Sequence, residues 1–95
     1  MEDSFYSFPL RAIRLVGLRP ELSEGRLRLL DKQGIKWEIR TITNLRLSLY
    51  HRNKQGTGMH YQKRSAPTTF GGVESLLNSI RQHEEYERRK RQYGL

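Results

Sequence analysis

The fold is decided by the stretch RLRLLDKQGIKWEIRTI, Arg26–Ile42, in which apolar and polar residues alternate on both sides of a glycine turn. Alternation of this kind is typical of strands that bury one face. The turn DKQG, Asp31–Gly34, has Asp first and Gly last, as type I turns prefer. We therefore predict a hairpin between strands at Arg26–Asp31 and Ile35–Ile42.

The same alternation continues outward from this hairpin. Downstream, it predicts strands at Leu45–Tyr50 and Met59–Ser65. Upstream, it predicts a first strand at Leu10–Val16, and Gly17–Gly25 is interpreted as a connecting loop. The pattern thus indicates about five antiparallel strands before the chain changes its period.

The C-terminal segment has the spacing of a helix. One apolar stripe is formed by Val73, Leu76, Leu77 and Ile80. Beyond it, three glutamates each precede an arginine by four residues, which supports a solvent-exposed helix; the pairs are Glu84–Arg88, Glu85–Arg89 and Glu87–Arg91. The basic run ERRKR is therefore interpreted as a solvated helix end rather than a binding motif.

Together these elements predict an α+β fold, an antiparallel sheet of about five strands with one long C-terminal helix packed on one face. We expect an N-terminal segment at 1–9, a single domain at 10–80 and a charged helix extension at 81–95. The predicted core consists of Leu27, Leu29, Ile35, Trp37, Ile39, Leu45, Leu47, Leu49, Tyr61, Leu76, Leu77 and Ile80.

Composition limits the cellular setting. The chain has no cysteine, which excludes disulfides, thiolate zinc sites and a thiol nucleophile. No apolar run approaches the roughly 20 residues of a membrane helix, and the start MEDSFYSFPL lacks the features of a secretory signal. We expect an intracellular protein without membrane contact, cytoplasmic or, if bound to nucleic acid, nucleoid-associated or nuclear.

The positive charge is concentrated before the helix. The net charge is +8, yet five basic and four acidic residues from Val73 onward nearly cancel, leaving thirteen basic and six acidic residues in 1–72. No acid occurs between Glu38 and Glu74. Strand alternation directs Arg14, Arg26, Arg28, Lys36 and Arg40 to the face opposite the helix, where Glu38 is the one acid that we expect.

The last hairpin is expected to extend this face. Pairing Leu49 with Tyr61 keeps the apolar side uniform, and it places Tyr50 across from His60 and Arg46 across from Arg64. The face would then offer cations for phosphates, rings for base stacking and neutral hydrogen-bonding groups, with a slim basic tip at Arg52–Gln55. The candidate nucleic-acid-binding residues are Arg26, Arg28, Arg40, Arg46, Tyr50, Arg52, Lys54, His60, Gln62 and Arg64.

Two alternatives to nucleic-acid binding remain open. The same basic face would also suit an acidic protein, with this chain acting as an interaction module or inhibitor. The charge would equally keep an open sheet face soluble and protect it from edge pairing. DNA and RNA are both possible partners, with single strands slightly favoured, and Tyr86 and Tyr93 on one side of the helix suggest a homodimer.

The sequence indicates neither a metal site nor catalysis. His51 and His60 flank the hairpin tip, but the preferred register places them on opposite faces without a nearby acid. The adjacent carboxylates Glu84 and Glu85 point to different sides of the helix. We therefore expect a non-enzymatic binding protein with no catalytic residues, no metal and no cofactor.

Overall fold

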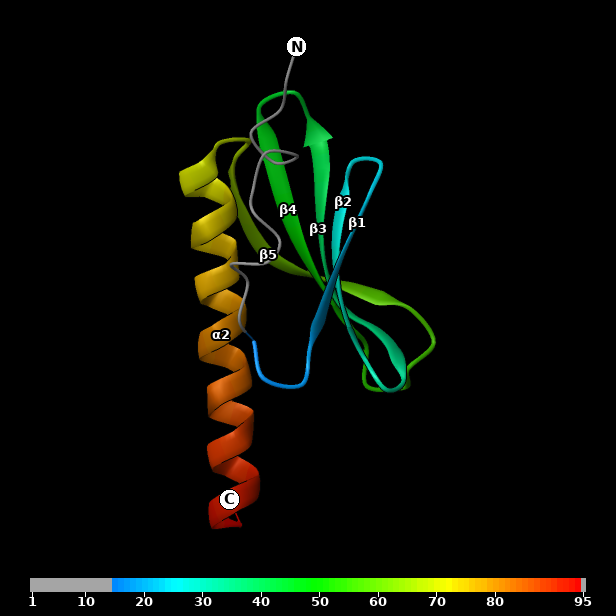
Figure 1. The fold of residues 1–95 in the computed structure, drawn as a ribbon, viewed down its shortest axis with the longest axis vertical. Coiled ribbons are helices and arrows are strands. Elements are labelled where there is room, and N and C mark those ends of the chain that lie inside the picture. Colours follow the sequence, from blue (N-terminus) through cyan, green and yellow to red (C-terminus); the bar gives the residue numbers. More distant parts are fainter. Residues whose placement is uncertain (1–14, 95) are drawn as a thin grey trace.

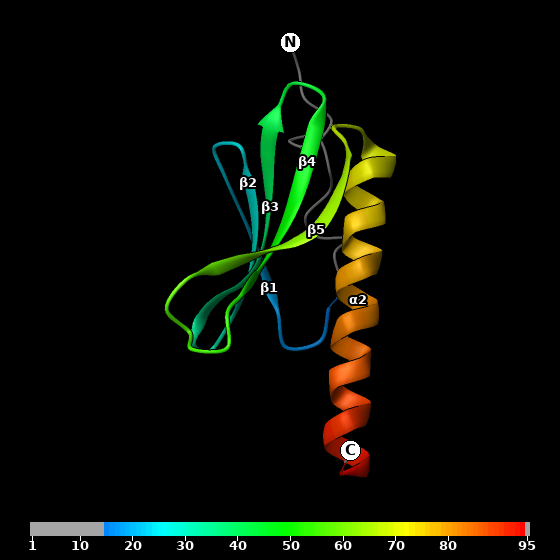
Figure 2. The same cartoon turned by 180° about the vertical axis from the view of Figure 1, so that it is seen from behind.

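The computed structural model describes residues 15–94, apart from the side chain of Tyr93. Its strands form one antiparallel sheet in chain order. The elements are β1 (Arg19–Ser23), β2 (Arg26–Asp31), β3 (Gly34–Thr43), β4 (Arg46–Arg52), β5 (Met59–Pro67) and α2 (Phe70–Tyr93). Helix α2 runs alongside β5 and packs against the sheet (Figures 1 and 2). The predicted α+β class is confirmed.

We call the face covered by α2 the inner face, and the opposite face the outer face. The helical stripe is buried as predicted, and it packs with the sheet and Leu15 into one core. The core residues are Leu15, Leu27, Leu29, Trp37, Ile39, Leu47, Leu49, Ala66, Val73, Leu76, Leu77 and Ile80. Three predicted members lie elsewhere: Leu45 and Tyr61 are 74% and 43% exposed, and Ile35 is half-buried.

The predicted loop Gly17–Gly25 was wrong, because it contains β1. Pro20 pairs with Leu29 at the edge of the sheet, where a strand tolerates proline. The strand predicted at Leu10–Val16 falls largely outside the described residues, as does Arg14. Its described end is a turn, closed by a 3.0 Å hydrogen bond from the Leu18 amide to the Leu15 carbonyl.

The predicted register of the last hairpin was also wrong. Tyr50 pairs with Tyr61, and His51 pairs with His60. The register shifts between Ser48 and Tyr50, and Lys63 in β5 has a left-handed backbone at φ 58°. The one-residue difference from the predicted register is already present beside the hairpin loop, where Arg52 pairs with Met59, and it moves the following β5 side chains to the other face. The bulge at Lys63 adds residues to β5 but leaves Tyr61 and Ser65 on the same face. Nothing in the alternating pattern signalled this one, since non-glycine residues with positive φ are uncommon.

The start of α2 has a specific local construction. Thr69 caps the helix, its hydroxyl oxygen accepting a 3.0 Å hydrogen bond from the Gly72 amide. A Cβ at position 72 would lie 1.9 Å from the Pro67 carbonyl oxygen. Close packing of α2 on β5 therefore requires glycine here. In the part of the chain that the structure describes, no helix has both the length and the apolar character needed to cross a membrane.

Candidate nucleic-acid interface

Two rows of paired residues cross the outer face. Cross-strand partners share a face, so each row is a set of neighbours. One row is Glu21, Arg28, Glu38, Tyr50 and Tyr61, and the other is Ser23, Arg26, Arg40, Ser48 and Ser65. The structure thus brings together four predicted site residues, which are Arg26, Arg28, Arg40 and Tyr50. Tyr61 takes the place predicted for His60.

Glu38 lies at the centre of these rows and is only 2% exposed. It accepts hydrogen bonds from Arg28 Nε, at 2.8 Å, and from Arg40 Nε. A third guanidinium, that of Arg26, approaches to 3.8 Å. A carboxylate has two acceptor oxygens, whereas each guanidinium has five N–H donors. Most donors of the three arginines therefore remain for other partners.

The pKa of Glu38 is held below its usual range. Burial alone would raise it, but hydrogen bonds from Arg28 and Arg40 stabilise the charged form more strongly. Glu38 consequently stays ionised at neutral pH. Its charge fixes the guanidiniums in place while neutralising only one of them.

Aromatic rings continue the cluster toward β5. Arg40 Cζ lies 4.0 Å from the centroid of the Tyr50 ring, a cation–π distance. The Tyr50 and Tyr61 centroids are 5.6 Å apart with their planes tilted by 47°. Cations and accessible rings are thus adjacent on the outer face.

Arg46 is exposed at the end of the same sheet face. Its Nη2 donates a 2.6 Å hydrogen bond to the Ser65 hydroxyl oxygen. Arg46 pairs with Pro67 rather than with Arg64, so the two arginines do not face each other as predicted.

Arg52 is committed to an ion pair, in contrast to the prediction of a phosphate contact. Its guanidinium donates two hydrogen bonds to the Asp31 carboxylate, at 2.9 and 2.7 Å. The hydrogen bond from Arg52 is the main cause that lowers the pKa of Asp31 to about 2. The positive charge of the stretch between Glu38 and Glu74 is therefore neutralised in part by Asp31 at the end of β2. Lys54 is exposed at the hairpin tip.

Three predicted site residues, His60, Gln62 and Arg64, lie toward the inner side, away from the Tyr50 ring. His60 pairs with His51, and Gln62 and Arg64 line a cleft beside Trp37 and α2. The hairpin register explains this difference, because Tyr50 pairs with Tyr61 rather than with His60, and a one-residue shift moves each side chain to the other face. The predicted placement of His51 and His60 on opposite faces was wrong for the same reason.

Lys36 also points to the inner side rather than to the predicted outer face. The β2–β3 register shifts at Leu29/Leu30. Leu29 pairs with Trp37 and Leu30 pairs with Ile35, so Lys36 is an extra residue between them without a partner in β2. Lys36 Nζ reaches Glu84 Oε2 at 2.7 Å and Glu87 Oε2 at 3.6 Å. A bulge thus converts a predicted outer-face cation into a bridge to α2.

Glu84 is a partly buried anchor that sequence reasoning assigned to the exposed helix end. Trp37 Nε1 donates a 2.9 Å hydrogen bond to its carboxylate. Burial alone would raise the pKa of Glu84, but hydrogen bonds from Lys36 and Trp37 lower it. Of the three predicted glutamate–arginine pairs, only Glu85–Arg89, at 2.9 Å, forms among the described residues.

A cluster of His51, His83 and Glu87 lies beside this anchor. The His51 ring centroid is 4.1 Å from that of Trp37 and 5.3 Å from that of His83. Burial, and next the proximity of His83, lowers the pKa of His51 and favours its neutral form. The spacing of His83 and Glu87, four residues apart on one helix face, was a usable sequence signal. No pattern in the sequence indicated that His51 would lie beside these two residues.

Comparisons with protein-family models, with curated proteins and with solved structures gave no match for this chain. The functional argument therefore rests on the geometry of the site.

Proposed function

We propose that the outer face of the sheet binds single-stranded nucleic acid and performs no chemistry on it. The observation that carries this proposal is the Glu38 cluster, in which three partly exposed guanidiniums adjoin the Tyr50 and Tyr61 rings. Phosphates accept several hydrogen bonds from arginine, and unpaired bases stack on aromatic side chains.

Each group has a distinct role. Arg26, whose side chain is 45% exposed, and Arg46 at the sheet end contact phosphates. Tyr61, which is 43% exposed, stacks with a base; the Tyr50 ring lies beside it, and Arg40 contacts the Tyr50 ring. Single strands suit this arrangement better than duplexes, because a duplex hides the base faces that a tyrosine stacks on.

Charge on this face favours a polyanion. Four guanidiniums, those of Arg26, Arg28, Arg40 and Arg46, stand against the carboxylates of Glu21 and Glu38. An acidic protein would meet the same cations, but it would not require the exposed tyrosine.

The test is a salt titration of binding, measured by fluorescence anisotropy with labelled single-stranded DNA, single-stranded RNA and duplex DNA. We expect single strands to bind more tightly than the duplex. Arg26→Ala should reduce the slope of log K against log salt by about 0.7, the value for one phosphate contact on a single strand. Tyr61→Ala should cost about 1–3 kcal/mol at an unchanged slope.

The matched control is Arg89→Ala, which removes the same charge from an exposed helix position. It should leave affinity nearly unchanged. The proposal fails if no nucleic acid binds at physiological salt, or if Arg89→Ala weakens binding as much as Arg26→Ala. Binding of polyglutamate as tight as that of oligonucleotides, with no effect of Tyr61→Ala, would instead indicate an acidic protein partner.

A further inference from the structure

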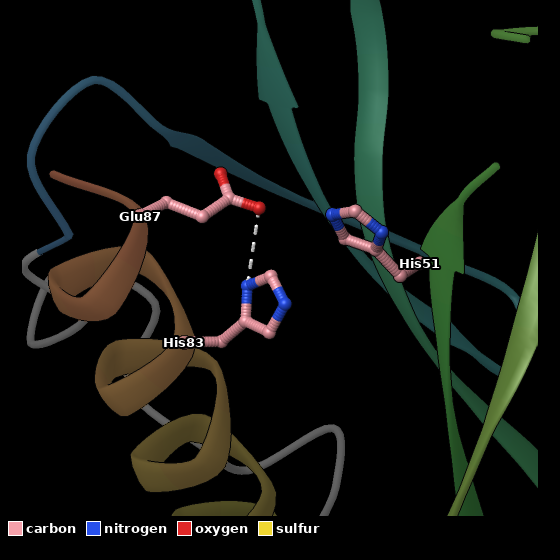
Figure 3. A group of neighbouring side chains, drawn as sticks. All are labelled: His51, His83 and Glu87. Carbon is pink, nitrogen blue, oxygen red and sulfur yellow. Dashed lines mark ion pairs between the residues drawn. The ribbon is translucent and has the colours of Figure 1, made fainter. Parts of the chain in front are cut away.

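Three ligand-type side chains converge where the second half of α2 meets β4. His51 comes from β4, and His83 and Glu87 come from α2; one donor atom from each lies within 4.8 Å of the others. Figure 3 shows one nitrogen of each ring facing the space beside the Glu87 carboxylate. This cluster lies on the inner side of the sheet and is independent of the proposed nucleic-acid interface.

Two nitrogens in this cluster lack ordinary partners. His51 Nε2 and His83 Nδ1 are buried, and neither has a hydrogen-bond partner among the described residues. Glu87 Oε1 lies 3.4 Å from His83 Nδ1, close enough for an ion pair if the imidazole is protonated. Buried polar atoms without partners carry a free-energy cost, so they often mark a site that a ligand completes.

We propose that His51, His83 and Glu87 form a binding site for a divalent transition-metal ion, with Zn²⁺ the best match. Two imidazoles and one carboxylate are a donor set that zinc accepts, with water in the fourth position. Donor atoms at about 2 Å from a tetrahedral ion are roughly 3.3–3.5 Å apart. The 3.4 Å between Glu87 Oε1 and His83 Nδ1 already matches this spacing, and a donor atom of His51 lies within 4.8 Å of a donor atom of each.

Local charge also favours a cation. The single ammonium of Lys36 faces two carboxylates, those of Glu84 and Glu87. Lys36 lies beside Oε2 of Glu87, which leaves Oε1 to the histidines. The cluster opens into a groove of about 1050 Å³, through which an ion and its water can enter. The cations Lys32, Lys54 and Arg91 line the same groove, but they are exposed and therefore screened by salt. Arg52, which also lines the groove, is paired with Asp31.

A bound ion would connect β4 to the part of α2 beyond the apolar stripe. The experiment uses the full chain without an affinity tag, freed of metal by a chelator and titrated with Zn²⁺ alone. Trp37 is the one tryptophan of the chain, and its ring lies 4.1 and 5.1 Å from the rings of His51 and His83. We expect one Zn²⁺ per chain by calorimetry, a change in Trp37 fluorescence and a rise in Tm.

Variants locate the ion. His83→Asn and Glu87→Gln should each weaken Zn²⁺ binding by tenfold or more, with the fold verified by circular dichroism. The matched control Glu85→Gln removes a carboxylate from an exposed position of the same helix and should bind as the wild type does. His60→Asn should also retain binding, and Mg²⁺, which prefers oxygen ligands, should not substitute for Zn²⁺.

Three outcomes would overturn the site. One is the absence of heat and of any fluorescence change at a tenfold excess of Zn²⁺. Another is loss of binding in His60→Asn with retention in His83→Asn, which would place the ion elsewhere. A third is an equal loss in Glu85→Gln and Glu87→Gln. If His83→Asn does not fold, Glu87→Gln with its control still decides the question.

Discussion

The outer and inner faces of the sheet differ in the ratio of cationic groups to carboxylates. On the outer face, Glu38 is shared by three guanidiniums, so cations exceed acids. At the inner end, Lys36 is shared by Glu84 and Glu87, so acids exceed cations. A net charge of +8 therefore does not describe either surface. The outer face suits a polyanion, whereas the inner cluster suits a cation.

The two clusters also differ in how the chain assembles them. The Glu38 cluster joins partners across adjacent strands, so it follows from the sheet register. The inner cluster joins Lys36 in β3 and His51 in β4 to α2 residues that follow more than thirty positions later, and a bulge in β3 directs Lys36 toward them. The outer cluster should therefore tolerate changes in α2, while the inner one depends on its docking.

The largest expected effect is that of Trp37→Ala, because Trp37 belongs to the core and also anchors the inner cluster. Loss of its packing should reduce the free energy of unfolding by about 3–5 kcal/mol, enough to unfold a domain of this size. Urea denaturation followed by circular dichroism measures the change. Tyr86→Ala, at a position that is 66% exposed, should change stability by less than about 0.5 kcal/mol. Similar losses in both variants would contradict the assigned faces.

The next effect compares the two carboxylates directly. Glu38→Gln leaves three guanidiniums without their shared anion, and we expect a loss of about 2–3 kcal/mol, below the usual cost of breaking a fully buried pair because the arginines are partly exposed. Glu84→Gln retains an acceptor for Trp37 and should cost only about 1 kcal/mol. Chemical denaturation of both variants shows which of the two carboxylates contributes more to the free energy of unfolding. A larger loss for Glu84→Gln would reverse the comparison.

Much of the fold could be predicted from alternation alone. The strands Arg26–Asp31 and Gly34–Thr43 and the helical stripe were evident, because one-sided burial imposes a period on the sequence. The Arg26, Arg28, Arg40 and Tyr50 part of the candidate site followed from the same rule.

Strand register accounts for most of what the sequence did not reveal. A one-residue difference in the β4–β5 register placed His60, Gln62 and Arg64 off the predicted face, and the bulge at Leu29/Leu30 moved Lys36 to the helix. An edge strand with proline, β1, was mistaken for a loop because Pro20 is typical of both. The partners of Asp31 and Glu84 depend on contacts between distant segments, which no local pattern contains.

The pH dependence of stability tests the ion pair between the two hairpin tips. The pKa of Asp31 falls from 3.8 to about 2 on folding, so the pair stabilises the fold above pH 3.8 and is lost as pH falls through 2. The shift corresponds to about 2 kcal/mol at most. We expect the stability difference between wild type and Asp31→Asn to be constant above about pH 5 and to shrink toward pH 2. A difference independent of pH would show that the Arg52 contact does not govern Asp31.

The smallest expected effect is that of removing residues 88–95, which tests whether the basic helix end or the outer face carries the binding charge. Glu87 still contacts Lys36 and His83, so the exposed extension begins after it rather than after Ile80. The deletion breaks one exposed pair, Arg89 with Glu85, worth about 0.3–0.5 kcal/mol. It also removes four basic residues, yet the phosphate contacts assigned to Arg26 and Arg46 remain. We therefore expect nearly unchanged stability, Zn²⁺ affinity and salt slope of oligonucleotide binding, the last measured by anisotropy. A slope reduced by several units in a folded, truncated protein would transfer the binding site from the outer face to the helix end.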